Sequence, residues 1–170
     1  NDLVKNSPVI EEVMPSFIEF IKDGVLVSHN ILGDLQFLRF YSEKVCKKTL
    51  HNIFLCTHLL SEKLYPESPQ KTLQGLTQYL QLPQQKKHRA KSDAYMTFEL
   101  FKSLLAKLSE NNLTTLAEAV RYQGYTDSCL LVGNPLYDLK FSQYPTTPGL
   151  VTLVDRNKNT LFSRVYKKIM

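Results

Sequence analysis

Cysteine is scarce in this chain of 170 residues, and its distribution argues against two classes of small protein. The three cysteines, Cys46, Cys56 and Cys129, are widely separated and form no Cys-x-x-Cys pair. Disulfide frameworks and structural zinc sites are recognised by cysteines in characteristic paired spacings. The sequence therefore indicates neither of them, and it favours a cytoplasmic location.

Long apolar runs are also missing. No stretch approaches the roughly 20 apolar residues that a membrane-spanning helix requires, and no signal-peptide pattern follows Asn1. We therefore expect no membrane partner. Because the chain opens on asparagine instead of methionine, we also expect it to be a piece of a longer protein. Its hydrophobic content of 43% and charged content of 22% are ordinary for a globular domain.

Acidic residues are fewer than basic ones, which gives a net charge of +5 and a pI near 9.0. A basic excess is compatible with a polyanionic partner, since lysine and arginine displace counterions from phosphates. It is equally compatible with an ordinary solvated surface. Charge alone leaves both interpretations open.

Hydrophobic periodicity predicts several helices and one short buried strand in the first two thirds of the chain. The strand is VLVSH at 25–29, and residues 54–65 are expected to pass from an extended segment into a helix. The helices are expected at 9–22, from Asp34 through about 45, at 72–82 before Pro83, at 91–108 and at 113–122.

The pattern changes after Leu108, where a polar break begins. Residues 133–149 contain three prolines and two glycines and are typical of a connector. Two alternating runs flank DRNKN at 155–159 and predict a β-hairpin. We divide the chain into 1–108, a helix and connector at 109–144, and a hairpin tail at 145–170.

Two short motifs carry candidate chemistry. In HNILGDLQFL (29–38), the strand ends on His29 and Asn30, and Asp34 stands near the start of the next helix, where a carboxylate is favoured electrostatically. In HRAKSDA (88–94), a loop histidine, His88, precedes Asp93 in the first turn of the strongest helix. Such a pair can act as general base and metal ligand. Taken singly, Asp34 is equally well an N-cap and His88 a surface histidine.

Taken together, the motifs resemble those of the DnaQ-like (DEDDh) 3′–5′ exonucleases, the proofreading family that includes the epsilon subunit of bacterial DNA polymerase III. VLVSHNILGDLQFL is similar to the family's second motif and HRAKSDA to its third, with a Leu-rich helix, TLQGLTQYLQL, between them. The resemblance covers about residues 1–108. It implies an α/β fold of ribonuclease H-like architecture.

The resemblance also implies roles for individual residues. Asp34 and Asp93 would be ligands of two divalent cations, Mg²⁺ or Mn²⁺, and His88 the base that deprotonates the attacking water. His29, Asn30 and Phe37 would line the nucleotide pocket. The implied substrate is a DNA 3′ end, and a replicative polymerase subunit is a possible partner.

The chain departs from the family in two places. Gly33 stands where an aromatic residue commonly precedes Asp34. No Asp-x-Glu, the family's first motif, occurs anywhere in the sequence, so two of the expected metal carboxylates are missing. We therefore expect a partial fold, truncated at its N-terminus, that is inactive as it stands.

Other interpretations remain open. The chain could be a non-catalytic remnant that binds a polymerase subunit or nucleic acid, or an exoribonuclease of the same superfamily. The tail weakly resembles the opening hairpin of GIY-YIG nucleases, although Val151 and FSRV (162–165) replace its signatures, and a plain hairpin is the better interpretation. Such a hairpin could add to an open edge of the strand at 25–29.

Overall fold

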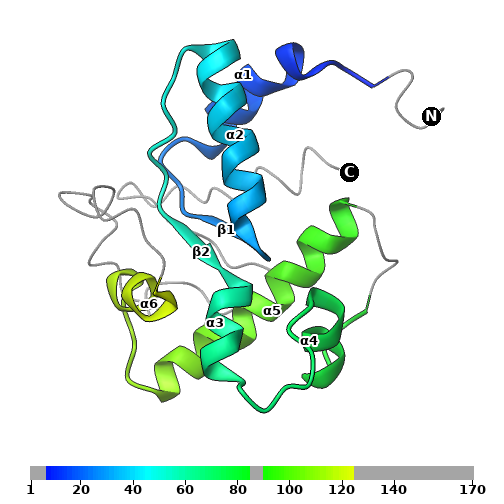
Figure 1. The fold of residues 1–170 in the computed structure, drawn as a ribbon, viewed down its shortest axis with the longest axis vertical. Coiled ribbons are helices and arrows are strands. Elements are labelled where there is room, and N and C mark those ends of the chain that lie inside the picture. The colour runs from blue at the N-terminus through cyan, green and yellow to red at the C-terminus, as the bar shows by residue number, and fades with distance from the viewer. Residues whose placement is uncertain (1–6, 85–89, 125–170) are drawn as a thin grey trace.

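The computed structural model describes residues 7–84 and 90–124, and it shows two short parallel strands between two groups of helices (Figure 1). Strand β1 (Leu26–Ser28) pairs in parallel with β2 (Phe54–Cys56), with Leu26 opposite Phe54. Helix α2 (Ile31–Cys46) connects the two strands, as a crossover between parallel strands requires. This α/β arrangement is consistent with the expected exonuclease architecture.

The remaining helices follow the hydrophobic periodicity of the sequence. They are α1 (Ile10–Ile21), α3 (Thr57–Leu64), α4 (Leu73–Tyr79), α5 (Ala90–Glu110) and α6 (Leu116–Gln123). The predicted strand at 25–29 and the passage from strand to helix at 54–65 are confirmed. The predicted connector at 133–149 and the hairpin around 155–159 lie outside the described residues.

Helix α6 begins later than the sequence predicted, and helix α2 begins earlier. Helix α6 starts at Leu116, not 113, because Thr115 and Glu118 form a capping box around its first turn. Helix α2 starts at Ile31, three residues before Asp34. Its N-cap is Asn30, in the left-handed conformation (φ 60°) that asparagine tolerates better than most residues. The alternative in which Asp34 caps this helix is therefore wrong.

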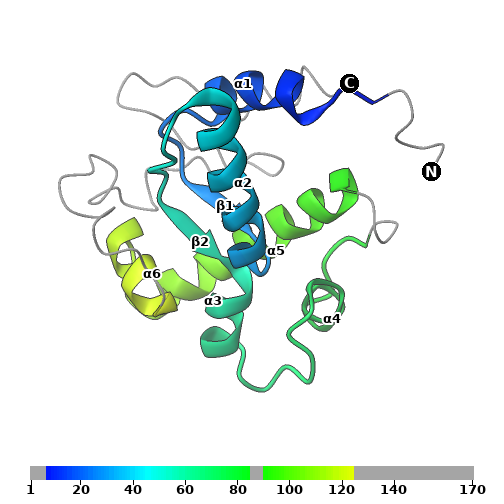
Figure 2. The same cartoon turned by 45° about the horizontal axis from the view of Figure 1, so that its top comes forward.

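The sheet separates two apolar cores, because alternate residues of a strand point to opposite faces. On one face, Leu55 and Val25 pack against α3, α4, α5 and α6. On the other face, Phe54 and Cys56 pack against Ile21 of α1 and against α2. Figure 2 shows α1 and α2 together on one side of the strands, with α5 passing across the other.

The two edges of this sheet differ. The amide side chain of Gln123 lies along the outer edge of β2, where its Oε1 accepts from the Cys56 N–H (2.9 Å) and its Nε2 donates to the Phe54 carbonyl (3.1 Å). This side chain satisfies the backbone groups that a third strand would otherwise bind. Within the described part of the chain, the opposite edge, on β1, has no strand beside it.

Candidate active site

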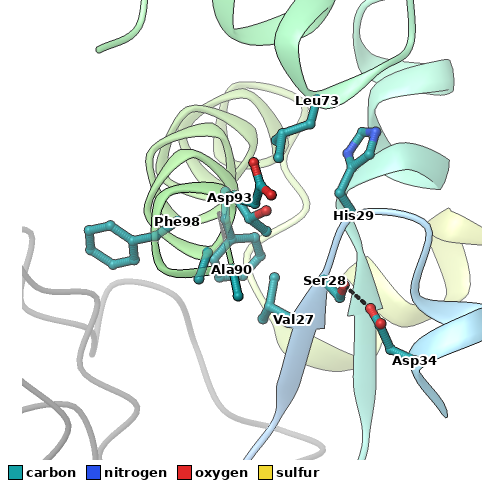
Figure 3. Close-up of a pocket in the computed structure, with 11 residues that line it drawn as sticks. Val27, Ser28, His29, Asp34, Leu73, Ala90, Asp93 and Phe98 are labelled. Atoms are coloured by element: carbon teal, nitrogen blue, oxygen red, sulfur yellow. Dashed lines mark hydrogen bonds between the residues drawn. The ribbon is translucent and has the colours of Figure 1, made fainter. Parts of the chain in front are cut away.

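A cavity of about 460 Å³ lies at the carboxyl end of β1 (Figure 3). Its walls come from the end of β1, the start of α2, the first residue of α4 and the first turns of α5. The two carboxylates predicted from the motifs, Asp34 and Asp93, both line it. The fold therefore brings them to one cavity although they are far apart in sequence.

Asp34 reaches the end of β1 from the first turns of α2. Its Oδ2 accepts a hydrogen bond from the hydroxyl of Ser28, the last residue of the strand. The carboxylate is otherwise exposed. This hydrogen bond fixes the orientation of the Asp34 carboxylate and engages Oδ2 but not Oδ1.

Asp93 lies in the first turn of α5 and faces the end of β1 (Figure 3). Among the atoms of the described residues, its Oδ1 is the buried side-chain oxygen that accepts no hydrogen bond. A buried carboxylate oxygen without a donor costs free energy, since it has lost its water and gained nothing in return. Such an atom is suited to a cation or a proton donor that completes the site.

His29 follows β1 directly and is partly buried. Its Nε2 lies 2.9 Å from the Lys71 carbonyl, and its Nδ1 lies 3.0 Å from the Thr57 hydroxyl. Burial lowers the pKa of His29 from 6.5 to about 4, the Lys71 carbonyl opposes that shift, and the neighbouring His58 adds to it. His29 is therefore neutral near pH 7.

The other predicted pocket residues lie at the edge of this cavity or outside it. Phe37 is 51% exposed and lines a second, apolar hollow of about 470 Å³ beside β1, which shares Ser28 and Asp34 with the first. Asn30 is exposed and caps α2. His88 lies outside the described residues, so its predicted role as a base stays a prediction.

Some residues of the cavity were not assigned to the site from the sequence. Ser28, Leu73 and Phe98 line it from β1, α4 and α5. Thr57 and Lys71 do not line it but bind the ring of His29, which does. Phe98 was visible in the apolar stripe of its helix. Leu73 was likewise visible in the apolar face of its helix, and Ser28 stands in the predicted strand without an assigned role. Thr57 and Lys71 gave no signal, because their partner, His29, is distant in sequence.

The described residues contain no group of three or more histidine, cysteine, aspartate or glutamate side chains placed to hold a metal ion. Asp34 and Asp93 are nevertheless the kind of ligand that Mg²⁺ and Mn²⁺ prefer, and Asp93 has an oxygen without a donor. These two residues fit part of a divalent cation site. The part of the chain described here also contains no helix long and apolar enough to cross a membrane.

Comparison with known proteins shows the family of the chain. A family model described as exonuclease matches residues 1–101. The chain is 37% identical over 116 residues to a PolC-type DNA polymerase III of Caldanaerobacter subterraneus, covering 68% of this chain and 8% of that protein. It is 32% identical over 108 residues to the DNA polymerase III subunit epsilon of Aquifex aeolicus, covering 64% and 54%. The epsilon subunit of Treponema pallidum is 31% identical over 114 residues, covering 66% and 53%.

The chain thus spans about half the length of these epsilon subunits and under a tenth of the PolC-type polymerase.

Proposed function

Because the chain belongs to the DnaQ-like exonuclease family, we propose that the cavity at the end of β1 is part of a nuclease site for the 3′ end of DNA. The observation that carries the proposal is that Asp34 and Asp93 both line that cavity. One is tied to the end of β1 through Ser28, and the other has a buried oxygen with no donor among the described residues.

Asp34 and Asp93 would hold divalent cations, Mg²⁺ or Mn²⁺, on the cavity side of the strand. When bound, such cations stabilise the attacking and leaving oxygens of an in-line phosphodiester hydrolysis. Ser28 would keep one Asp34 oxygen engaged and so present the other. His88, on the segment before α5, would take the proton of the attacking water.

The apolar side of the cavity suits a nucleobase. Phe98 lines it from α5, and aromatic faces stack on bases with little dependence on sequence. Phe37 and Asn30, both exposed near the start of α2, are available to the neighbouring nucleotide. The relatives named for DNA polymerase III favour DNA as substrate and a polymerase subunit as partner.

Two carboxylates are too few to hold two cations in an ordered pair. Within the described ranges, no third histidine, cysteine or acidic side chain is placed with them so that the group could hold a metal ion. We therefore propose that the 170-residue chain binds a divalent cation weakly and does not turn over substrate by itself.

The test measures cation binding and activity separately. Mn²⁺ binding to the full chain, followed by electron paramagnetic resonance, should be detectable and should weaken about tenfold or more in Asp34→Asn and in Asp93→Asn, the scale expected for groups of a metal site. Asp23→Asn is the matched control, because Asp23 is exposed on the turn between α1 and β1. Equal binding by all four proteins would refute the metal site.

Activity is measured on 5′-labelled single-stranded DNA with Mg²⁺ or Mn²⁺, with a matched RNA strand in parallel. We expect no release of nucleotides from either strand. Turnover of DNA that disappears in Asp93→Asn would show that the site is complete. The proposed inactivity would then be wrong, and the proposed location of the site would stand. Turnover of RNA alone would replace the DNA substrate by RNA.

A further inference from the structure

His29 connects three segments that surround the proposed nuclease site. We propose that His29 is a positioning residue, which anchors the connection between α3 and α4 to the end of β1 and so fixes the Leu73 wall of the cavity. In this role it touches neither the cation nor the nucleotide. The inference rests on the proposed function only in treating the cavity that Leu73 lines as a nuclease site.

Both ring nitrogens of His29 are already engaged. A carbonyl can only accept, so Nε2 carries the proton and donates it to the Lys71 oxygen at 2.9 Å. In the neutral ring, Nδ1 is then an acceptor, and it faces the Thr57 hydroxyl at 3.0 Å. That hydroxyl is closer to Nδ1 than to the Ser28 carbonyl, which lies 3.4 Å away. No ring nitrogen remains for a phosphate or a water.

The partner of Nε2 is well placed to transmit this anchoring. The Lys71 ammonium donates to the carbonyls of Tyr65, Pro66 and Ser68 at 2.7 to 3.2 Å, which braces the connection internally. The Lys71 carbonyl binds the whole braced segment to His29. Thr72 follows as the N-cap of α4, and Leu73, its first residue, lines the cavity.

The partner of Nδ1 ties the same ring to the start of α3. Thr57 is fully buried and is the first residue of that helix. His58 contributes an edge contact, with ring centroids 5.4 Å apart and planes at 73°. The ring of His29 is therefore held by β1, α3 and the segment that leads into α4.

The first experiment reads the ring directly in the full chain by ¹⁵N nuclear magnetic resonance. We expect the Nε2-protonated neutral tautomer at pH 7, unchanged when Mg²⁺ and thymidine monophosphate are added. The proposal is overturned if the ring is protonated on Nδ1. It is also overturned if adding Mg²⁺ or thymidine monophosphate shifts the ring signals by as much as a direct contact with His29 would. His51, exposed in the loop before β2, is the control ring.

The second experiment tests the mechanical role by amide hydrogen exchange at Lys71, Thr72 and Leu73. Thr57→Val removes the hydroxyl and Thr57→Ser retains it. We expect exchange about fivefold faster in the valine variant, corresponding to about one hydrogen bond, and close to wild type in the serine variant. Equal exchange in both variants overturns the proposal.

These outcomes do not depend on the proposed function. A chain that fails to bind Mn²⁺ would refute the nuclease site, while the tautomer and the exchange rates would still decide the role of His29. Conversely, equal amide exchange at Leu73 in the two Thr57 variants, together with intact Mn²⁺ binding, would refute the positioning role of His29 alone.

Discussion

Acidification should destabilise the chain through His29. The pKa of this residue is about 4 in the folded state and 6.5 in the reference state, so the unfolded chain binds its proton first as the pH falls. The stability that a neutral, buried His29 contributes is complete above pH 6.5, the unfolded pKa. It falls as the pH drops from 6.5 to about 4 and changes no further below that pH.

The magnitude follows from linkage. Between pH 7 and pH 5 these two values correspond to roughly 1.8 kcal/mol of lost unfolding free energy. Because the His29 side chain is only partly buried, solvent screening reduces the expected loss to about 1 kcal/mol. Carboxylates contribute little in this range, since their reference pKa values lie near 4.

The assay is urea unfolding at pH 7, 6 and 5, for the wild type and for His29→Gln, which cannot titrate there. We expect the wild type to lose about 1 kcal/mol more than the variant over this interval. His51→Gln is the control and should lose as much as the wild type. Parallel pH dependence of the wild type and His29→Gln would refute the reasoning, because the imidazole would then titrate alike in both states.

Three further substitutions test the contacts that hold the fold. Gln123→Leu should lower the unfolding free energy by about 2–4 kcal/mol, because it removes two hydrogen bonds to buried backbone groups. An unfolding free energy equal to that of Gln36→Leu, a substitution at an exposed helical position, would contradict this. Lys71→Met should lower the unfolding free energy by about 1–3 kcal/mol and speed local amide exchange, since three carbonyls lose the hydrogen bond that the Lys71 ammonium donates. Unchanged amide exchange across residues 65–72 would argue against it. Thr115→Ala should lower the unfolding free energy by about 1 kcal/mol through loss of the capping box, and an unchanged urea midpoint would count against that cap.

The sequence predicted those parts of the fold that depend on local pattern. The apolar stripes of α1 and α5 identified both helices to within a few residues, since burial of one helical face imposes that spacing. The start of α2 was placed too late, because the left-handed Asn30 that begins it gives no periodic signal.

The site was predictable only where residues form a motif. Asp34 and Asp93 were found from their neighbours in the chain, and the structure places both at one cavity. The environment of His29 was not predictable. Its partner is a backbone carbonyl 42 residues away, and any residue at position 71 would supply that oxygen.

The side chain that closes the edge of β2 also constrains how the chain assembles during synthesis. Gln123 lies 67 and 69 residues after the groups it binds on Cys56 and Phe54. Ribosomal synthesis is directional, so both strands emerge long before the residue that protects this edge. Until α6 docks, a nascent chain exposes backbone donors and acceptors that another strand can bind. Contacts so distant in sequence also form slowly. A chaperone that shields the β2 edge should therefore act on ribosome-bound chains that end before Gln123 and release those in which α6 has emerged.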